Sequence, residues 1–151
     1  KMVTISGDGI QEPHNVYVAI GTPVASIVEA CGGYASDHCL LIAGGPMMGL
    51  TIPNDQFVIG LANNGLTILK FQEVLSVKCL RCGKCTEVCP SGLEPVRIQF
   101  AEKMKDIETL KRLDVNSCIQ CGLCSYICPS KLQVTENVAR AKRYMALVSA
   151  K

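Results

Sequence analysis

The stretches CLRCGKCTEVCP (residues 79–90) and CIQCGLCSYICP (residues 118–129) decide the fold of this 151-residue chain. Each stretch places three cysteines at gaps of two residues, a fourth after three more residues, and then a proline. Extended to residues 79–93 and 118–132, the two copies share eight identities in fifteen positions, namely four Cys, Gly, Pro, Ser and Leu. The second half of the chain is therefore an internal repeat built around eight cysteines.

This cysteine spacing is typical of the bacterial ferredoxin run that holds 4Fe–4S clusters. One tight loop can offer sulfur to three of the four irons of a cubane, provided that the loop curls around one face of the cube. Gly83 and Gly122 each follow the second cysteine of a run, and glycine supplies the backbone freedom that such a curl needs. We therefore predict two 4Fe–4S clusters.

The fourth cysteine of each run lies beyond the curl and, in chains with two such runs, ligates the other cluster. This exchange predicts which sulfurs share a site. The first cluster is assigned to Cys79, Cys82, Cys85 and Cys128, and the second cluster to Cys118, Cys121, Cys124 and Cys89.

Three other uses of the cysteines fit the pattern less well. A zinc site uses two CxxC pairs, whereas each run here has an additional cysteine and no histidine nearby. A disulfide framework is typical of an oxidising compartment, and no apolar leader of a secretory signal is present in this sequence. Eight clustered thiols used only as core residues would be reactive and would bring no packing advantage.

The charge of the chain is small but uneven. The total is +2, which divides into −3 for residues 1–78 and +5 for residues 79–151. Thiolate-bound clusters carry negative charge, so the basic excess of the second half compensates for buried anions. We expect no nucleic-acid binding, because no RNA- or DNA-binding motif accompanies the charge.

The sequence contains no apolar run of the roughly 20 residues that a membrane span requires. It opens with Lys1-Met2 directly before a strand-like MVTIS, which we interpret as a piece cut from a longer protein. Ten cysteines without a secretory signal indicate a reducing compartment.

Residues 1–75 are predicted to form a small α+β domain in which a mixed sheet grips one helix. MVTISG and NVYVAI read as strands joined by a glycine-rich turn, and CLLIAG and LTILK (66–70) read as further strands. Thr22-Pro23 is interpreted as an N-cap followed by proline at the first helical position. The helix VASIVEAC is expected to end at Gly32-Gly33.

Residues 76–151 are predicted to be helical around the clusters, so the whole chain is assigned to the α+β class. Pro95 opens a helical stretch that is expected to break near Lys105-Asp106, with Asp106 as the second cap. The expected apolar stripes are Val96, Phe100, Met104, Ile107 and Leu110 before the second run, and Val138, Ala141, Met145 and Val148 after it.

The remaining candidate side chains predict no catalysis. Cys31 and Cys39 each lie alone at the edge of an apolar stretch, which is typical of a buried thiol. His14 and His38 lie in expected loops without a partner motif. No catalytic residue is assigned, since the sequence shows neither a nucleophile with its base nor a pair of carboxylates placed for acid–base chemistry.

With both modules in view, the chain resembles the C-terminal part of RnfC, a subunit of the membrane-associated Rnf electron transport complex. The motifs that carry this resemblance, ahead of the two cluster runs, are GDGI (7–10), IGTPV (20–24), GGPMMG (44–49) and NNGL (63–66). The resemblance implies a soluble-ligand-binding β-grasp (SLBB) domain at 1–75 and a helical dicluster ferredoxin-like domain at 76–151.

The resemblance also implies a function. The full-length protein would belong to an ion-translocating oxidoreductase that passes electrons between ferredoxin and NAD, with FMN and NADH bound by a preceding domain. This piece would be an electron-transfer relay, peripheral on the cytoplasmic side of the bacterial inner membrane. Its membrane contact would be indirect, through the other Rnf subunits.

Other functions remain open at this point. One alternative is a regulatory or scaffold module whose clusters are structural or redox-sensing. Another is a proline-reductase-associated electron carrier, which shares the same architecture. An SLBB domain with an apolar pocket would bind a small molecule, although the sequence offers no convergent polar set. Stable one-electron cycling at low potential would support the relay, whereas oxidative loss of the clusters with a change of partner would support sensing.

Two surface hypotheses follow from the sequence. Arg81 and Lys84 in the first run are replaced by Gln120 and Leu123 in the second, which suggests that the first run docks an acidic electron carrier such as ferredoxin. GGPMMG is interpreted first as a turn, with Met47 and Met48 available to pack on a neighbouring domain or subunit.

Overall fold

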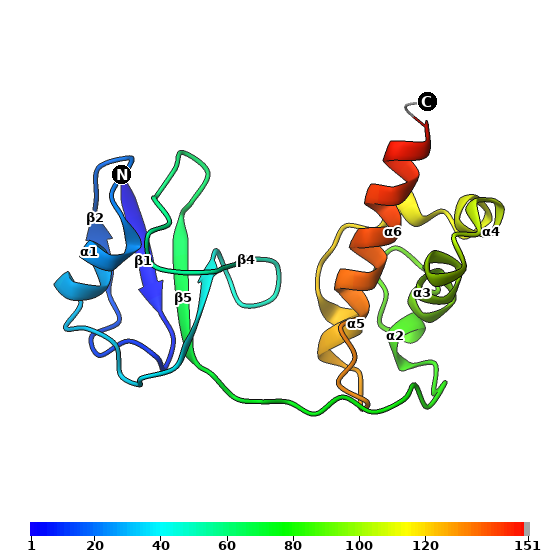
Figure 1. Cartoon of the computed structure of the whole chain (residues 1–151), viewed down its shortest axis with the longest axis horizontal. Coiled ribbons are helices and arrows are strands. Elements are labelled where there is room, and N and C mark those ends of the chain that lie inside the picture. Colours follow the sequence, from blue (N-terminus) through cyan, green and yellow to red (C-terminus); the bar gives the residue numbers. More distant parts are fainter. Residues whose placement is uncertain (150–151) are drawn as a thin grey trace. The chain divides into compact units, whose positions relative to one another are not determined.

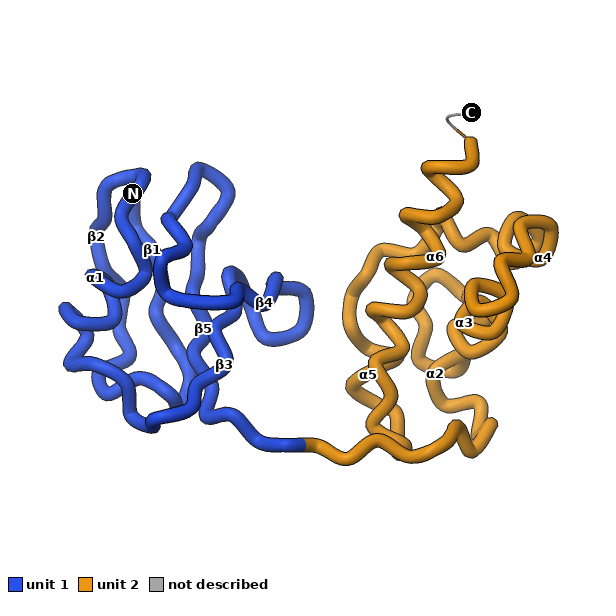
Figure 2. Tube along the Cα trace, viewed as in Figure 1, with its two compact units in different colours: residues 1–73 blue, residues 74–151 orange. Residues whose placement is uncertain are grey.

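The computed structural model describes residues 1–149. The chain forms two compact units, which divide between Glu73 and Val74 (Figure 1 and Figure 2). The first unit contains all the strands and one helix, and the second unit contains only helices among its described residues.

The first unit is a five-stranded mixed sheet with one helix. Its strands lie in the order β2-β1-β5-β3-β4. The parallel pair is β1 with β5, whereas β1–β2, β3–β5 and β3–β4 are antiparallel. The elements are β1 (Met2–Ser6), β2 (Asn15–Tyr17), α1 (Val24–Ala30), β3 (Cys39–Ala43), β4 (Leu50–Ile52) and β5 (Gly65–Lys70). The predicted mixed sheet with a single helix is thereby confirmed.

The core of this unit lies between α1 and the sheet. Val24, Ile27 and Val28 form the buried face of α1, at the spacing that places side chains on one side of a helix. Apolar strand residues, among them Val3, Ile5, Leu66 and Ile68, complete the core, together with the fully buried Cys31. The interpretation of Cys31 as a core residue is confirmed, while Cys39 is only partly buried against this core.

The start of α1 differs from the prediction. The helix begins at Val24, and the N-cap is Pro23 in an extended conformation, with no side-chain cap. Thr22 instead donates its hydroxyl to the carbonyl of Ala19 at 2.8 Å. Because Pro23 is extended and lies outside the helix, and the Thr22 hydroxyl binds the Ala19 carbonyl, the assignment of Thr22 as N-cap was wrong. The end of the helix was predicted correctly, since Gly32 and Gly33 both have positive φ.

The loops of this unit also carry recognisable sequence features. GGPMMG forms a turn between β3 and β4, with Met47 and Met48 exposed. Strand β4 was not predicted as a separate element, and β2 is shorter than expected because Ile20 lies outside it and is exposed. His14 and His38 lie in exposed loop positions, as predicted.

The second unit repeats a short helix followed by a long one. The elements are α2 (Lys84–Glu87), α3 (Pro95–Met104), α4 (Ile107–Arg112), the 3₁₀ turn η1 (Val115–Ser117), α5 (Leu123–Tyr126) and α6 (Val134–Ser149). Helices α3 and α6 pack against each other, and α4 and η1 also lie against α6. The prediction of a helical second module is confirmed for its described residues.

The break between α3 and α4 occurs where the sequence predicted it. Lys105 adopts a left-handed conformation with φ of 54°, and the Asp106 carboxylate accepts a hydrogen bond from the Thr109 backbone N–H at 3.0 Å. This cap holds the pKa of Asp106 below its ordinary value, chiefly through its hydrogen bonds with Thr109. Asp106 is therefore the N-cap of α4.

The buried face of α3 differs from the prediction. Phe100 and Met104 are exposed, and the face that packs inward carries Ile98, Ala101 and Glu102. A carboxylate would be costly there without partners, but Arg140 on α6 donates two hydrogen bonds of 3.0 Å to Glu102. The stripe on α6 was predicted correctly for Val138, Ala141 and Met145, which are buried, whereas Val148 is half-buried.

Across residues 1–149, every helix is either too short or too polar to cross a lipid bilayer.

Candidate iron–sulfur sites

Each cysteine run folds into the same local structure. Gly83 and Gly122 have φ of 79° and 85°, a left-handed conformation that glycine adopts readily. Each glycine is the N-cap of a four-residue helix, α2 or α5. In each run, the first two cysteines precede this helix, the third lies within it and the fourth follows it. The expected use of the two glycines for the loop curl is confirmed.

The first cavity of the helical unit has an empty volume of about 320 Å³, part of which is open to solvent. Three sulfur-bearing residues of the first run line it, and the fourth cysteine in its wall is Cys128 of the second run. Apolar side chains, including Val96, Leu132 and Val134, form much of the remaining wall. The cysteines that line it are Cys79, Cys82, Cys85 and Cys128.

The second cavity has an empty volume of about 370 Å³, part of which is open to solvent, and its cysteine lining is the reciprocal of the first. Three cysteines of the second run line it, and its fourth cysteine is Cys89 of the first run. The cysteines that line it are Cys118, Cys121, Cys124 and Cys89. The structure therefore gathers the eight cysteines into two groups of four, each containing three residues from one run and one from the other.

The donor set of each cavity fits a 4Fe–4S cluster. A cubane needs four thiolates spread around it, and the two cavities have similar volumes and equivalent cysteine linings. All ten cysteines of the chain are free thiols. No set of three or more His, Cys, Asp or Glu side chains within the described residues is arranged to hold a single metal ion.

Backbone amides point at several of these sulfurs. The N–H of Arg81 donates to Cys79 Sγ, and the N–H of Gln120 donates to Cys118 Sγ, both at 3.4 Å. Arg81 and Gln120 occupy equivalent places in the two runs and have φ of 54° and 55°. A third amide, that of Leu93, donates to Cys89 Sγ at 3.4 Å.

Side-chain hydroxyls reach one sulfur of the second group. The Oγ1 atom of Thr135 lies 3.2 Å from Cys124 Sγ. Ser125 donates its hydroxyl to Thr135 Oγ1 at 2.9 Å and accepts the Thr135 backbone N–H at 2.8 Å. Burial raises the pKa of the Cys124 thiol, while the hydrogen bond to Thr135 acts in the opposite direction.

The two runs differ in exposure. Cys82, Arg81 and Lys84 of the first run are exposed, whereas Cys121 and Leu123 of the second are half-buried. The Arg81 guanidinium lies 5.9 Å from the centre of the Phe100 ring. Beside it, a shallow hollow is lined by Arg81, Arg97 and Phe100, among others.

Ser130 ties the segment before the first run to the second run. Its hydroxyl donates to the carbonyl of Lys78 at 3.1 Å, and its carbonyl accepts the Val77 N–H at 3.1 Å. Sequence reasoning missed Ser130, Ser125 and Thr135. A comparison of the two copies would have found Thr135, because Val96 occupies its position in the first copy.

The other candidate residues of the sequence lie elsewhere. Cys31, Cys39 and the two histidines belong to the first unit and are not among the residues that line these cavities.

Comparison with known families matches both units. Residues 2–51 match the model of the SLBB domain, and residues 78–132 match the model of the 4Fe-4S dicluster domain. The chain is thus an SLBB domain followed by an iron–sulfur dicluster domain.

Curated proteins with similar sequences indicate the family to which these two domains belong. The chain is 40% identical over 111 residues to the C subunit of the ion-translocating oxidoreductase complex of Rhodobacter capsulatus, covering 72% of this chain and 21% of the relative. It is 38% identical over 98 residues to the C subunit of the proton-translocating ferredoxin:NAD(+) oxidoreductase complex of Clostridium ljungdahlii, covering 63% and 21%. The corresponding C subunit of the Na(+)-translocating ferredoxin:NAD(+) oxidoreductase complex of Acetobacterium woodii is 35% identical, covering 65% and 23%.

The chain belongs to the family of these C subunits, which confirms the resemblance to RnfC. It spans about a fifth of the length of these relatives.

Proposed function

We propose that this chain transfers electrons through two 4Fe–4S clusters with exchanged ligands. The observation that carries the proposal is the reciprocal lining of the two cavities, in which each run contributes its fourth cysteine to the other group. Cys79, Cys82, Cys85 and Cys128 would hold the first cluster, and Cys118, Cys121, Cys124 and Cys89 the second.

A bound 4Fe–4S cluster takes up and releases single electrons. The residues of this chain would hold the clusters, stabilise their negative charge and exclude water. Thiolates from both runs fix each site, and the amides of Arg81, Gln120 and Leu93 stabilise negative charge on the ligating sulfurs. Apolar residues such as Val96 and Val138 exclude water from the cavity walls. Because each run holds both sites, the arrangement also limits reorganisation when an electron arrives.

We further propose that the full-length protein acts in an Rnf complex, as the names of its relatives suggest. In this proposal, a domain ahead of this chain binds FMN and NADH, and ferredoxin is the acidic electron carrier. The other Rnf subunits are its partners, and through them it sits peripherally on the cytoplasmic side of the membrane. This chain itself would be the electron-transfer module of that oxidoreductase.

The first unit is proposed to be a β-grasp domain over residues 1–75, and the dicluster domain is proposed to cover residues 76–151. The order β2-β1-β5-β3-β4, with one helix between β2 and β3, supports this arrangement. Strand β5 lies between the antiparallel hairpins β1–β2 and β3–β4, parallel to β1 and antiparallel to β3.

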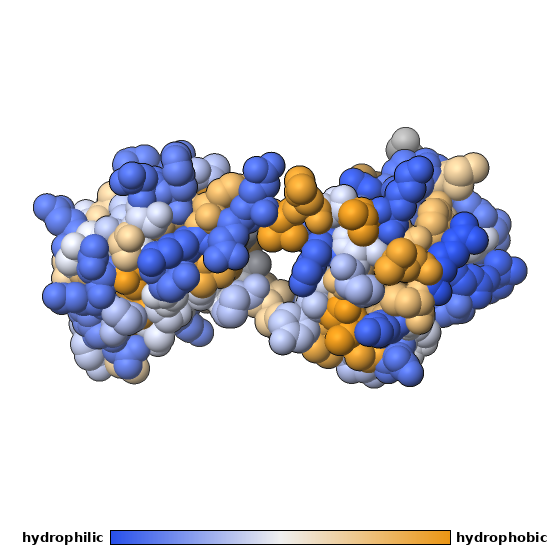
Figure 3. Space-filling view, turned by 90° about the horizontal axis from the view of Figure 1, so that it is seen from below, coloured by the Kyte–Doolittle hydropathy of each residue, from blue (hydrophilic) through white to orange (hydrophobic). Residues whose placement is uncertain are grey.

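We propose that the surface around Arg81 and Lys84 docks the acidic carrier. Both side chains are exposed and flank the exposed Cys82, so a partner bound there would lie close to the first site. Arg97 and Phe100 extend this surface along α3. Figure 3 shows hydrophilic and apolar surface side by side on the visible face of the helical unit.

The experiment that tests the dicluster proposal uses anaerobically purified or reconstituted protein. We expect about eight iron and eight sulfide per chain, from two clusters of four each, with two interacting one-electron signals by EPR after reduction with dithionite. Cys128→Ser should perturb the cluster held by residues 79–85, and Cys89→Ser the cluster held by residues 118–124. Cys39→Ala in the first unit is the control, and it should leave both signals unchanged.

Zinc in place of iron, or no metal in a folded chain, would overturn the dicluster proposal. If Cys128→Ser perturbed only the cluster held by residues 118–124, the clusters would be present and the ligand exchange would be wrong.

A further inference from the structure

The two cluster sites are related by the internal repeat but differ in their hydrogen-bond donors. Residues 39 positions apart correspond, so Val96 in α3 occupies the place of Thr135 in α6, and Thr86 that of Ser125. Val96 and Cys85 line the first cavity, just as Thr135 and Cys124 line the second. The second site therefore has the Thr135 hydroxyl beside Cys124, whereas the first site has the apolar side chain of Val96 at the equivalent position.

The hydroxyl chain of the second site has a defined direction. The Thr135 N–H donates to Ser125 Oγ, and the Ser125 hydroxyl donates to Thr135 Oγ1. The Thr135 proton is then free to point at Cys124 Sγ, 3.2 Å away. A sulfur that ligates iron carries no proton and can only accept, so Thr135 must be the donor once the site is filled.

Backbone donors add to this difference. At the second site, Cys118 accepts from Gln120 N–H and Cys89 accepts from Leu93 N–H. At the first site, the Arg81 N–H to Cys79 is the sole counterpart among the hydrogen bonds of residues 1–149. With Thr135 included, three hydrogen-bond donors reach the cysteine sulfurs of the second site and one reaches those of the first, among the hydrogen bonds of residues 1–149.

Nearby cations do not cancel this difference. The Lys142 ammonium donates to the Cys118 carbonyl at 2.8 Å in a partly buried position, which also favours negative charge at the second site. Arg81 and Lys84 at the first site are exposed, where water and salt screen their charge. Cys82 is more exposed than its counterpart Cys121, which favours reduction of the first site, and a direct measurement of the Thr135 contribution separates the two effects.

Hydrogen bonds to cluster sulfurs stabilise the more negative, reduced state and raise the reduction potential. We propose that Thr135 is a potential-setting residue, which makes the second site the one that holds the first electron. This inference rests on the proposed dicluster function. When the chain holds a single electron, this electron moves from the first cluster to the second, so the first cluster is oxidised and the second is reduced. No bond forms or breaks, and no proton moves.

The test is an EPR-monitored reductive titration of the anaerobic chain with dithionite. Thr135→Val keeps the shape and the backbone N–H to Ser125 but removes the hydroxyl. It should shift the higher of the two midpoint potentials negatively, with about a tenfold change in the one-electron equilibrium, equivalent to about 59 mV. Thr135→Ser should restore the value of the unmodified chain.

Val96→Thr is the matched variant at the other site. It should raise the lower midpoint potential and narrow the gap between the two sites, because its hydroxyl would face Cys85. Iron and sulfide content serves as the folding control for every variant.

The proposal is overturned if Thr135→Val leaves both potentials unchanged or shifts the lower one. Failure of the underlying function looks different, since the unmodified chain would then show no pair of one-electron signals at all.

Discussion

At the residue scale, glycines define the geometry on which both units depend. Gly7 in the GDGI motif has φ of 112°, and a Cβ built there would lie 1.9 Å from the carbonyl oxygen of Ile68. The neighbouring residues use this close approach: Gly9 N–H donates to Ile68 at 2.9 Å, and Asp8 accepts the Lys70 N–H at 2.9 Å. GDGI therefore closes the loop after β1 onto strand β5.

We expect Gly7→Ala to destabilise the first unit by about 1–3 kcal/mol from backbone strain, with a further loss from the clash. The matched control is Gly45→Ala, because a Cβ at that position meets nothing within 4 Å. Thermal unfolding of the two variants measures the difference. Equal stability of both variants would show that the loop relaxes freely and that Gly7 is not required.

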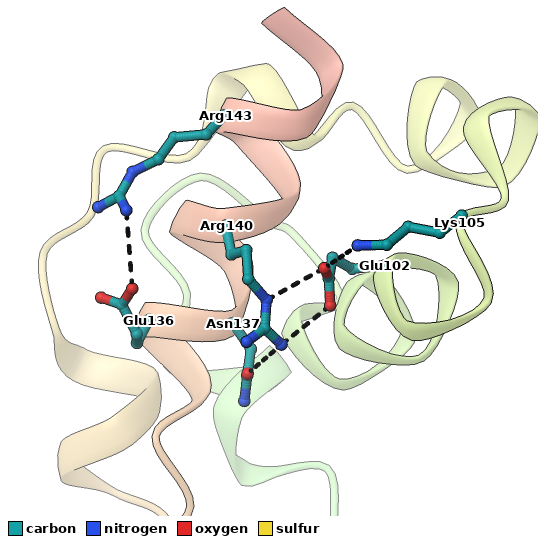
Figure 4. A network of polar contacts seen from close by, with 6 residues as sticks. All are labelled: Glu102, Lys105, Glu136, Asn137, Arg140 and Arg143. Atoms are coloured by element: carbon teal, nitrogen blue, oxygen red, sulfur yellow. Dashed lines mark hydrogen bonds and ion pairs between the residues drawn. The ribbon is translucent and has the colours of Figure 1, made fainter. Parts of the chain in front are cut away.

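At the element scale, α3 and α6 are joined by a buried carboxylate. Glu102 is 1% exposed and is bound by Arg140 and Lys105; Asn137 supports Arg140 from the same helix (Figure 4). Hydrogen bonds from Arg140, and next from Lys105, hold the pKa of Glu102 below its ordinary value of about 4.5. The carboxylate is therefore ionised at neutral pH and fixes the packing of the two long helices.

Glu102→Gln should reduce the stability of the second unit by about 1–3 kcal/mol, because a charged hydrogen-bond acceptor is lost in a buried position. We expect the lower part of this range, since Arg140 and Lys105 are about half exposed. Because the pKa of Glu102 is lower in the folded chain than in the unfolded chain, its ionised carboxylate stabilises the fold fully at any pH above the pKa of the unfolded chain. This stabilisation is lost only as the pH falls through the pKa of the folded chain. The loss should therefore be constant between about pH 6 and 8.

Chemical denaturation of the anaerobic chain measures this loss. Glu108→Gln is the control, because the Glu108 side chain is 86% exposed in its pair with Lys111, and it should have little effect. A Glu102→Gln loss that changed steeply across the neutral range would contradict the assigned ionisation.

At the scale of the whole molecule, the exposed Arg81, Cys82 and Lys84 form the docking surface proposed for an acidic electron carrier. The charge reversals Arg81→Glu and Lys84→Glu should slow association with an acidic one-electron carrier about tenfold at low ionic strength. They should also flatten the dependence of the rate on salt, since electrostatic steering is lost. Stopped-flow reduction of the clusters by reduced ferredoxin measures both quantities.

The control is Lys111→Glu with Arg112→Glu on α4, an equal charge change at two other exposed positions. It should alter the rate far less. A rate and salt dependence left unchanged by the Arg81 and Lys84 reversals would remove the docking surface from the proposal.

The features that depend on local chemistry could be predicted from the amino-acid sequence alone. The cysteine spacing, the glycines after the second cysteine, the Asp106 cap and the apolar stripe of α6 are all set by residues close together in the chain. Local conformation and helical periodicity are short-range properties, so the loop curl, the break at Lys105-Asp106 and the helical class of the second unit could be predicted. The family resemblance followed from motifs of the same kind.

Which helix faces are buried, and which side chains from separate elements contact one another, could be seen only in the tertiary structure. The buried face of α3 carries Glu102 because Arg140, 38 residues away, reaches it, and no pattern within α3 reveals that partner. The order of the five strands and the contact of Thr135 with Cys124 arise in the same way. Each joins residues from separate elements, and such contacts depend on packing and on the satisfaction of buried polar groups rather than on local sequence.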